Sequence, residues 1–137
     1  MIKINQQLLG YINVFESVTK AKVVDAFVDV NDKVVFVVEE GDMGKAIGKA
    51  GINIRRLGNM MKKNLRIIEF NNDAVKFVRN IIMPIKTESI EIEDNLVLIN
   101  PGNTQSKAML IGRNRAKLNE INMIVKRHFK NIEVKIA

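Results

Sequence analysis

Residues 47–54 read IGKAGINI, and this stretch is the most informative about the fold. Its glycines, Gly48 and Gly51, stand three positions apart, and a residue without a Cβ lets the main chain turn tightly and approach another backbone closely. Apolar periodicity on both sides predicts a helix before the loop and a second helix that begins at it. A helix start favours a phosphate through its free N–H groups and its dipole. We expect an anion to bind at this loop, because three basic side chains surround it: Lys45, Lys49 and Arg55.

Two classes of nucleotide-binding enzyme also use glycine-rich loops, and neither pattern fits. A P-loop that ends at Gly48-Lys49 needs glycine at position 43 and serine or threonine at position 50, where the chain has Met43 and Ala50. A dinucleotide-binding fingerprint needs a glycine at position 46, which is Ala46. We therefore expect no nucleotide-dependent enzyme at this loop.

Outward from the loop, hydrophobic periodicity predicts a definite order of elements. Residues 34–38 are a continuous apolar run, which is typical of a buried central strand. Residues 23–30 alternate in a way that predicts a half-buried strand, and Asn31-Asp32 supplies a turn between the two. The remaining elements are a helix over 5–17, a short helix at 43–47, a longer helix through 54–61 and a strand over 65–70.

The same order recurs in the rest of the chain, which indicates an internal duplication. Its predicted elements are a helix over 73–83, strands at 90–93 and 96–99, a short helix around 108–110, a longer helix through 118–125 and a strand over 132–136. Sliding the sequence by 64 positions places Ile47-Gly48 on Ile111-Gly112. We predict an α+β fold of two tandem domains, residues 1–71 and 72–137. Each would read helix-strand-strand-helix-helix-strand, with the helices packed on one face of a three-stranded sheet.

Positive charge is concentrated in corresponding parts of the two halves. The formal net charge is +7; residues 41–66 carry seven basic residues against one acid, and residues 103–130 carry the same numbers. Each window therefore has a net charge of +6, and the rest of the chain has −5. Helices that are basic only for solubility usually intersperse acids among their bases. The near absence of acids favours an anionic partner over a merely solvated surface.

Composition excludes several kinds of site. The chain has no cysteine and one histidine, His128, so it offers neither disulfides nor a metal site built from several Cys or His ligands. An aromatic content of 5% with no Trp gives little support to a platform that stacks nucleobases. No apolar run approaches the ~18 residues of a membrane span, and the amino terminus lacks a secretory signal. We expect a cytoplasmic monomer with no cofactor and no membrane partner.

The loop and its setting resemble a known family. The stretch 47–54 matches the KH signature I-G-x-x-G-x-x-I, and the helix and strand ahead of the βααβ core resemble the type II KH arrangement. Residues 40–51, together with residues 1–4 and 126–129, resemble the archaeal NusA family, whose members consist of two KH domains. This resemblance covers essentially the whole chain. It implies a transcription elongation or termination factor, with single-stranded RNA and RNA polymerase as partners.

The resemblance also implies roles for individual residues. Gly48, Lys49, Ala50 and Gly51 would clamp the backbone of about four nucleotides, as KH domains do. Two isoleucines, Ile47 and Ile54, would either form an apolar floor beneath the bases or pack in the core. Lys45 and Arg55 would supply flanking positive charge.

The second half departs from the signature at one position. It reads Gly112-Arg113-Asn114-Arg115, so that Arg115 stands where the second glycine is expected. A side chain there obstructs close approach of another backbone, and a positive φ is disfavoured for it. Arg113 and Arg115 can still reach phosphates through their forked donors. We expect the second domain to be a weakened contributor to RNA binding, with a supporting role for the first domain as the alternative.

Three other functions compete with the leading hypothesis. The chain could be mainly a protein adaptor that docks on RNA polymerase or on ribosomal protein, with RNA binding incidental. It could instead bind RNA at the ribosome, since that function shares the fold. A hydrolase is the most distant reading, because the two basic windows lack the acids that nuclease chemistry needs. We therefore expect no enzymatic activity.

Overall fold

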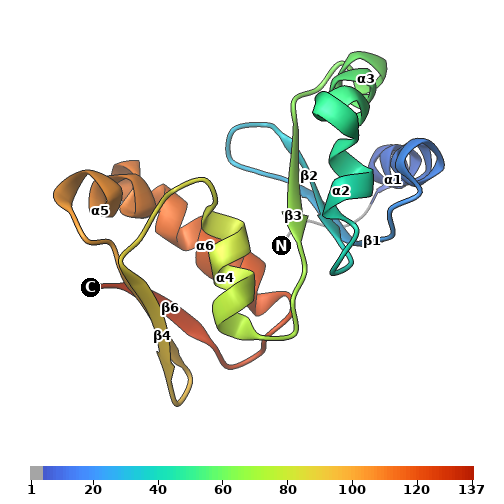
Figure 1. Ribbon diagram of the computed structural model, residues 1–137. Helices are drawn as coiled ribbons and strands as arrows, with labels where there is room; N and C mark the ends of the chain where they lie inside the picture. Colours follow the sequence, from blue (N-terminus) through green and yellow to red (C-terminus); the bar gives the residue numbers. More distant parts are fainter. Residues whose placement is uncertain (1–4) are drawn as a thin grey trace. The chain divides into compact units, whose positions relative to one another are not determined.

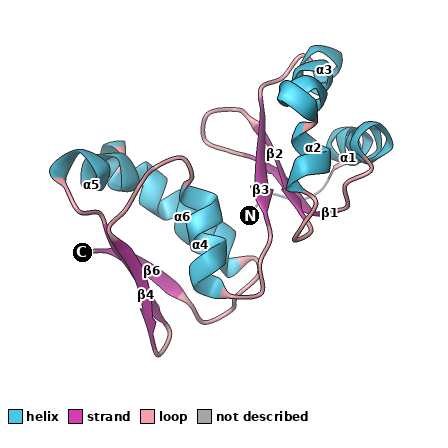
Figure 2. Ribbon diagram, viewed as in Figure 1, coloured by secondary structure: helices cyan, strands magenta, loops and turns pink. Residues whose placement is uncertain are grey.

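The computed structural model of the protein describes residues 5–137. Residues 1–4, which contribute to the family resemblance, lie outside the described residues. The chain divides into two compact units at the boundary between Phe70 and Asn71 (Figure 1). Each unit is α+β and contains one three-stranded sheet (Figure 2).

The first unit has the element order that the periodicity predicts. It consists of α1 (Gln6–Thr19), β1 (Val23–Val28), β2 (Val34–Val38), α2 (Met43–Ile47), the short 3₁₀ turn η1 (Lys49–Gly51), α3 (Ile52–Met61) and β3 (Leu65–Glu69). The strand order is β1-β2-β3, in which β1 is antiparallel to β2 and β3 is parallel to it. The parallel pair needs a crossover connection, which the two helices α2 and α3 provide.

The core of the first unit joins the helices to alternate residues of β2. Asn5 begins α1 by accepting a hydrogen bond from the Leu8 N–H at 2.8 Å. About two turns after Leu8, the ring of Phe15 stacks on that of Phe36 in β2, with the ring centroids 4.2 Å apart. All five residues of β2 are buried, as a continuous apolar run predicts for a central strand. The core cluster is Leu8, Phe15, Ala21, Ala26, Val34, Phe36, Val38, Ala46, Leu57 and Met61.

Strand β1 differs from the predicted half-buried strand. Ala26 and Phe27 are neighbours on opposite faces, and both are fully buried. The strand also ends at Val28 rather than at residue 30. The physical reason is Asp29, whose carboxylate accepts hydrogen bonds from the N–H groups of Asn31 and Lys33, each at 2.9 Å. These bonds turn the chain before the predicted end of the strand.

The second unit repeats the same order of elements. It consists of α4 (Ala74–Ile82), β4 (Ser89–Glu93), β5 (Leu96–Asn100), α5 (Thr104–Ile111), the 3₁₀ turn η2 (Arg113–Arg115), α6 (Ala116–Lys126) and β6 (Glu133–Ile136). Its sheet has the order β4-β5-β6, again with one antiparallel and one parallel pair. Side chains of Asp73 and Asn103 cap the amino ends of α4 and α5. Over residues 5–137, no helix has the length and apolar character needed to cross a membrane.

Candidate nucleic-acid interface

Residues 48–51, here called the first loop, join α2 to α3 in an unusual backbone conformation. Gly48 has φ 76° and ψ 168°, Ala50 has φ 54° and ψ 27°, and Gly51 has φ 74° and ψ 18°. Lys49 and Ala50 are exposed at the tip, and the two glycines are half-buried. Ala50 accepts a left-handed conformation that costs an L-residue about 1 kcal/mol. The exposed tip of the loop therefore includes a residue, Ala50, in a backbone conformation that L-residues disfavour.

The two glycines of the first loop are needed for different reasons. A Cβ at position 48 would lie 2.8 Å from Cγ of Asn53, so a side chain at that position collides with α3. A Cβ at position 51 would meet only Nη1 of Arg55, at 3.8 Å, which is ordinary contact. Gly48 is thus required by space as well as by its φ, whereas Gly51 is favoured by its φ alone.

Residues 112–115, the second loop, have the same backbone conformation as the first. Gly112 has φ 73° and ψ 171°, Asn114 has φ 54° and ψ 31°, and Arg115 has φ 63° and ψ 19°. Arg115 therefore adopts the positive φ that sequence reasoning treats as disfavoured. The first loop explains why this is tolerated: the position of the second glycine is open, so the residue bears only the backbone cost of about 1 kcal/mol. Asparagine at position 114 also adopts this conformation more readily than alanine does.

The first glycine is retained in both loops for a steric reason. A Cβ at Gly112 would lie 2.8 Å from both Cβ and the backbone N of Lys117. Lys117 follows Gly112 at the same spacing as Asn53 follows Gly48. The helix after each loop therefore comes close enough to exclude a side chain at the first position and not at the fourth.

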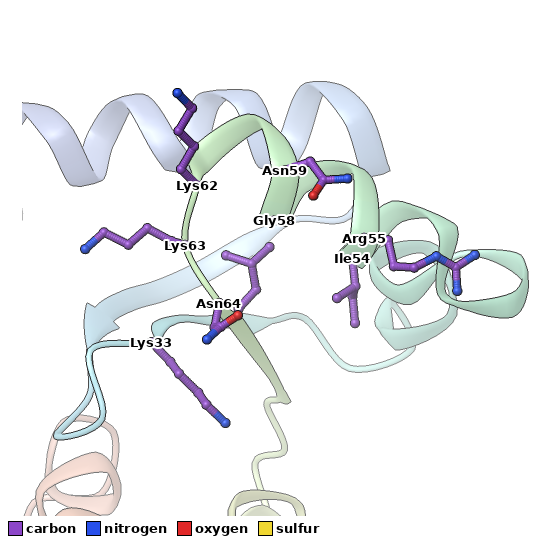
Figure 3. Close-up of a pocket in the computed structure, with 9 residues that line it drawn as sticks. Lys33, Ile54, Arg55, Gly58, Asn59, Lys62, Lys63 and Asn64 are labelled. Carbon is purple, nitrogen blue, oxygen red and sulfur yellow. The ribbon is translucent and has the colours of Figure 1, made fainter.

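A groove beside the first loop, here called the first groove, extends from α3 to the beginning of β3 (Figure 3). Its volume is about 630 Å³. The lining residues are Lys33, Ile54, Arg55, Gly58, Asn59, Lys62, Lys63, Asn64 and Leu65. Ile54 is half-buried and lies at the groove, outside the buried core cluster, and Ile47 is half-buried outside both. The floor beneath a ligand stays a prediction for both isoleucines.

Charge around the first groove is positive. Four of its lining residues are basic and none is acidic: Lys33, Arg55, Lys62 and Lys63. Lys33 was missed by sequence reasoning, because it belongs to the turn between β1 and β2 and carries no motif. Only the folded chain places this turn near the end of α3, so nothing in the sequence around Lys33 indicates that it lines the groove.

The fold also brings acids to part of the basic window. Lys63 pairs with Asp32 at 3.1 Å, and Arg66 lies 3.7 Å from Asp29. Within the window itself, Lys45 lies 3.7 Å from Asp42. Counting charges along residues 41–66 therefore overestimates the unpaired positive charge, because Asp29 and Asp32 lie outside that window and approach it only in the folded chain.

The basic residues nearest the first loop remain available to an anion. Arg55 donates from Nη1 to the carbonyl oxygen of Ala50 at 2.8 Å, which ties the guanidinium to the loop and leaves its other donors exposed. Over residues 5–137, no ion pair involves Lys49 or Arg55. These two cations therefore present their charge to solvent at the tip and at the start of α3.

The second unit has a comparable groove, here called the second groove, of about 520 Å³. Its lining residues are Ile111, Arg115, Leu118, Asn119, Asn122, Lys126, Glu133, Val134, Lys135 and Ile136. Arg113 and Asn114 are exposed at the loop tip, and Gly112 is half-buried. This groove is less uniformly basic than the first, since Glu133 lies among its lining residues.

A family comparison identifies a known domain in the chain. The family model described as KH domain matches residues 10–95, which is more than half of the chain. The matched range includes β1 to β3 with both helices and the loop between them, and it continues through β4.

Relatives with assigned names match the chain as well. A protein of Methanococcus vannielii named "Probable transcription termination protein NusA" is 39% identical over 92 residues, or 67% of this chain and 53% of that relative, so the match spans about half of its length. A protein of the same name from Methanocaldococcus jannaschii is 28% identical over 98% of this chain and 75% of its own. The crystal structure of APE1850 superposes with a TM-score of 0.76 at 29% identity, covering 98% of this chain and all of that one.

Proposed function

Because the chain belongs to the KH domain family and is related to archaeal NusA proteins, we propose that it is a single-stranded RNA-binding factor of transcription elongation or termination. It acts by binding rather than by catalysis. The names of its relatives support the role in transcription. The geometry and charge of the first loop and the first groove support single-stranded RNA as the ligand.

One observation carries the RNA-binding proposal: the first loop and the first groove share Arg55. Its guanidinium bonds the carbonyl of Ala50 in the loop, and the same residue lines the groove. A sugar-phosphate held at the loop, close to Lys49, therefore directs its bases toward the groove and Ile54. The exposed tip and the small residues of the loop allow the RNA backbone to approach closely.

Basic residues along the first groove would bind further phosphates of the same RNA strand. Lys33 and Lys62 line the groove from two different loops, and they would contact phosphates that follow those held at the first loop. Such contacts release counterions from the RNA, so that affinity falls steeply as salt is raised. A flat salt response would instead favour the adaptor hypothesis.

We also propose that each unit is a KH domain, close to residues 1–71 and 72–137. The repeated element order and the matching backbone of the two loops support this assignment. The second domain would contribute less affinity than the first, through Arg113 and Arg115. RNA polymerase or the ribosome remains the proposed protein partner.

Fluorescence anisotropy with a labelled single-stranded RNA tests the proposal. The double variant Lys49→Asp, Ala50→Asp places two carboxylates at the tip of the first loop, and we expect it to lower affinity at least tenfold. The matched control is Lys130→Asp, Asn131→Asp, which makes the same change in charge at two exposed residues of the second unit. Equal losses for both pairs would show a general charge effect and contradict a clamp at the first loop.

A further inference from the structure

The side chain of Asn122 connects α6 to the edge strand β6. Its Oδ1 accepts a hydrogen bond from the Val134 N–H at 2.8 Å, and its Nδ2 donates to the Val134 carbonyl at 3.0 Å. Nδ2 also lies 3.2 Å from the carbonyl oxygen of Leu118, one turn earlier in α6. One carboxamide therefore satisfies both backbone groups of one strand residue, and both residues line the second groove.

These backbone groups lie on the free edge of the second sheet. Glu133 and Ala137, an even number of positions apart, both face β5, since the Glu133 N–H donates to the Asn95 carbonyl and the Ala137 N–H donates to the Ile99 carbonyl, each at 2.9 Å. Groups of alternate residues in a strand point to opposite sides, so those of Val134 point away from β5. A donor and an acceptor side by side match the hydrogen-bonding edge of a nucleobase, just as they match the carboxamide that occupies them.

The first unit lacks this side chain. Sliding by 64 positions places Gly58 on Asn122, and Gly58 lines the first groove without a side chain that could reach β3. The Val34 N–H donates to Asn64 at 3.0 Å and the Phe70 N–H donates to Val38 at 2.8 Å, so the groups of Leu65 and Ile67 face away from β2.

The two edges differ in exposure as well. Leu65 and Ile67 are half-buried, whereas Val134 is 1% exposed. Among the described residues, no side chain is hydrogen-bonded to the backbone of Leu65 or Ile67. The strand edge at the first groove is therefore open, and the edge at the second groove is occupied.

We infer that Asn122 is a specificity-determining residue, because it occupies the strand edge at which the second unit would otherwise read a nucleobase. The second unit then holds RNA through its loop and its basic side chains without selecting a base at Val134. Base selection at a strand edge falls to the first unit alone. This inference rests on the proposed RNA binding. It assigns the preference for particular RNA bases to the first unit more than to the second.

An NMR titration of the wild-type chain with oligo(A), oligo(C) and oligo(U) of equal length tests the inference without a variant. We expect the amides of residues 112–115 to shift on binding while the Val134 amide and the Asn122 side-chain amide keep their positions. The amides of Leu65 and Ile67 should shift with the first loop. Shifts of Val134 and Asn122 in step with the second loop would overturn the inference and leave RNA binding intact. An absence of shifts in both loops would instead remove the proposed function and the inference with it.

Substitution at Asn122 provides a second readout. Asn122→Gly reproduces the residue of the first groove, and we expect the affinity ratio between the best and the worst homopolymer to widen by about fivefold or more, as one additional base contact would produce. Met123→Gly is the matched control: it introduces a glycine at the neighbouring half-buried position of the same helix, which does not line the second groove. An unchanged ratio in folded Asn122→Gly protein, or equal widening in the control, would contradict the assignment.

Discussion

The side-chain amide of Asn53 donates a hydrogen bond to the main-chain carbonyl of Lys45 at 2.8 Å, across the base of the first loop. This bond connects the first turn of α3 to α2, and the side chain that makes it fills the space beside Gly48. A loop that is exposed at its tip is thus held at its base by one amide. The absence of a Cβ at position 48 is the condition for that bond.

Gly48→Ala should therefore destabilise the first unit, because the added methyl collides with Asn53 and because the φ of 76° is strained for alanine. We expect the free energy of unfolding to fall by about 2–4 kcal/mol, which urea denaturation would measure. Gly51→Ala is the control, with an expected cost of about 1 kcal/mol, since its Cβ would make only an ordinary contact with Nη1 of Arg55 at 3.8 Å. Similar losses at the two positions would refute the steric argument.

Arg115→Gly separates the shape of the second loop from its charge. Glycine relieves a left-handed residue at φ 63°, so we expect the free energy of unfolding to stay level or to rise by up to about 1 kcal/mol. RNA affinity should fall nonetheless, because a forked cation is lost. Unfolding curves and anisotropy on the same sample give both quantities. A variant that binds RNA more tightly than the wild type would show that Arg115 obstructs the RNA backbone.

Lys33 and Lys62 should each contribute about one unit to the slope of the logarithm of affinity against the logarithm of salt concentration, if each contacts a phosphate. The variants Lys33→Ala and Lys62→Ala are measured by anisotropy over a range of salt concentrations. Lys86→Ala, at an exposed residue remote in sequence from both loops, serves as the control and should leave the slope unchanged. Identical slopes for all three variants would exclude the first groove as a path for the RNA.

Asp29→Ala should destabilise the first unit more than Asp32→Ala. The Asp29 side chain is 2% exposed, accepts two backbone hydrogen bonds in the β1–β2 turn and lies beside Arg66, so its removal leaves two part-buried N–H donors and a guanidinium without this partner. We expect a loss of about 2–4 kcal/mol in the free energy of unfolding. Asp32 forms an exposed pair with Lys63, which is worth at most about 1 kcal/mol. Thermal and urea unfolding would rank the two variants, and the reverse order would contradict this account.

Much of the fold follows from local patterns in the sequence. Apolar period predicts each helix and strand to within a few residues, and the spacing of Gly48 and Gly51 predicts the loop between α2 and α3. The exception is β1, where the alternation predicts one buried face and the structure buries Ala26 and Phe27 on both. Whether the second face of a strand is buried depends on the segments that pack against it, and the residues of the strand alone do not identify those segments.

The candidate site is less predictable than the fold. Lys33 joins the first groove from a turn that carries no motif, and Asp29 and Asp32 reduce the positive charge that a count along the chain assigns to Lys63 and Arg66. These relationships connect residues that are more than 20 positions apart in the chain. Chain order alone does not measure such distances.

Local patterns along the chain predict the order of elements, the two glycine loops and their basic surroundings, because periodicity, turn chemistry and residue type are local properties. The tertiary structure is needed to see that the second loop has the backbone conformation of the first although Arg115 replaces a glycine, since this depends on the space beside the fourth loop position. It also decided that Asn122 covers the edge of β6 while Gly58 leaves that of β3 open. Both outcomes depend on how closely a helix approaches a loop or a strand, and that distance is a property of packing.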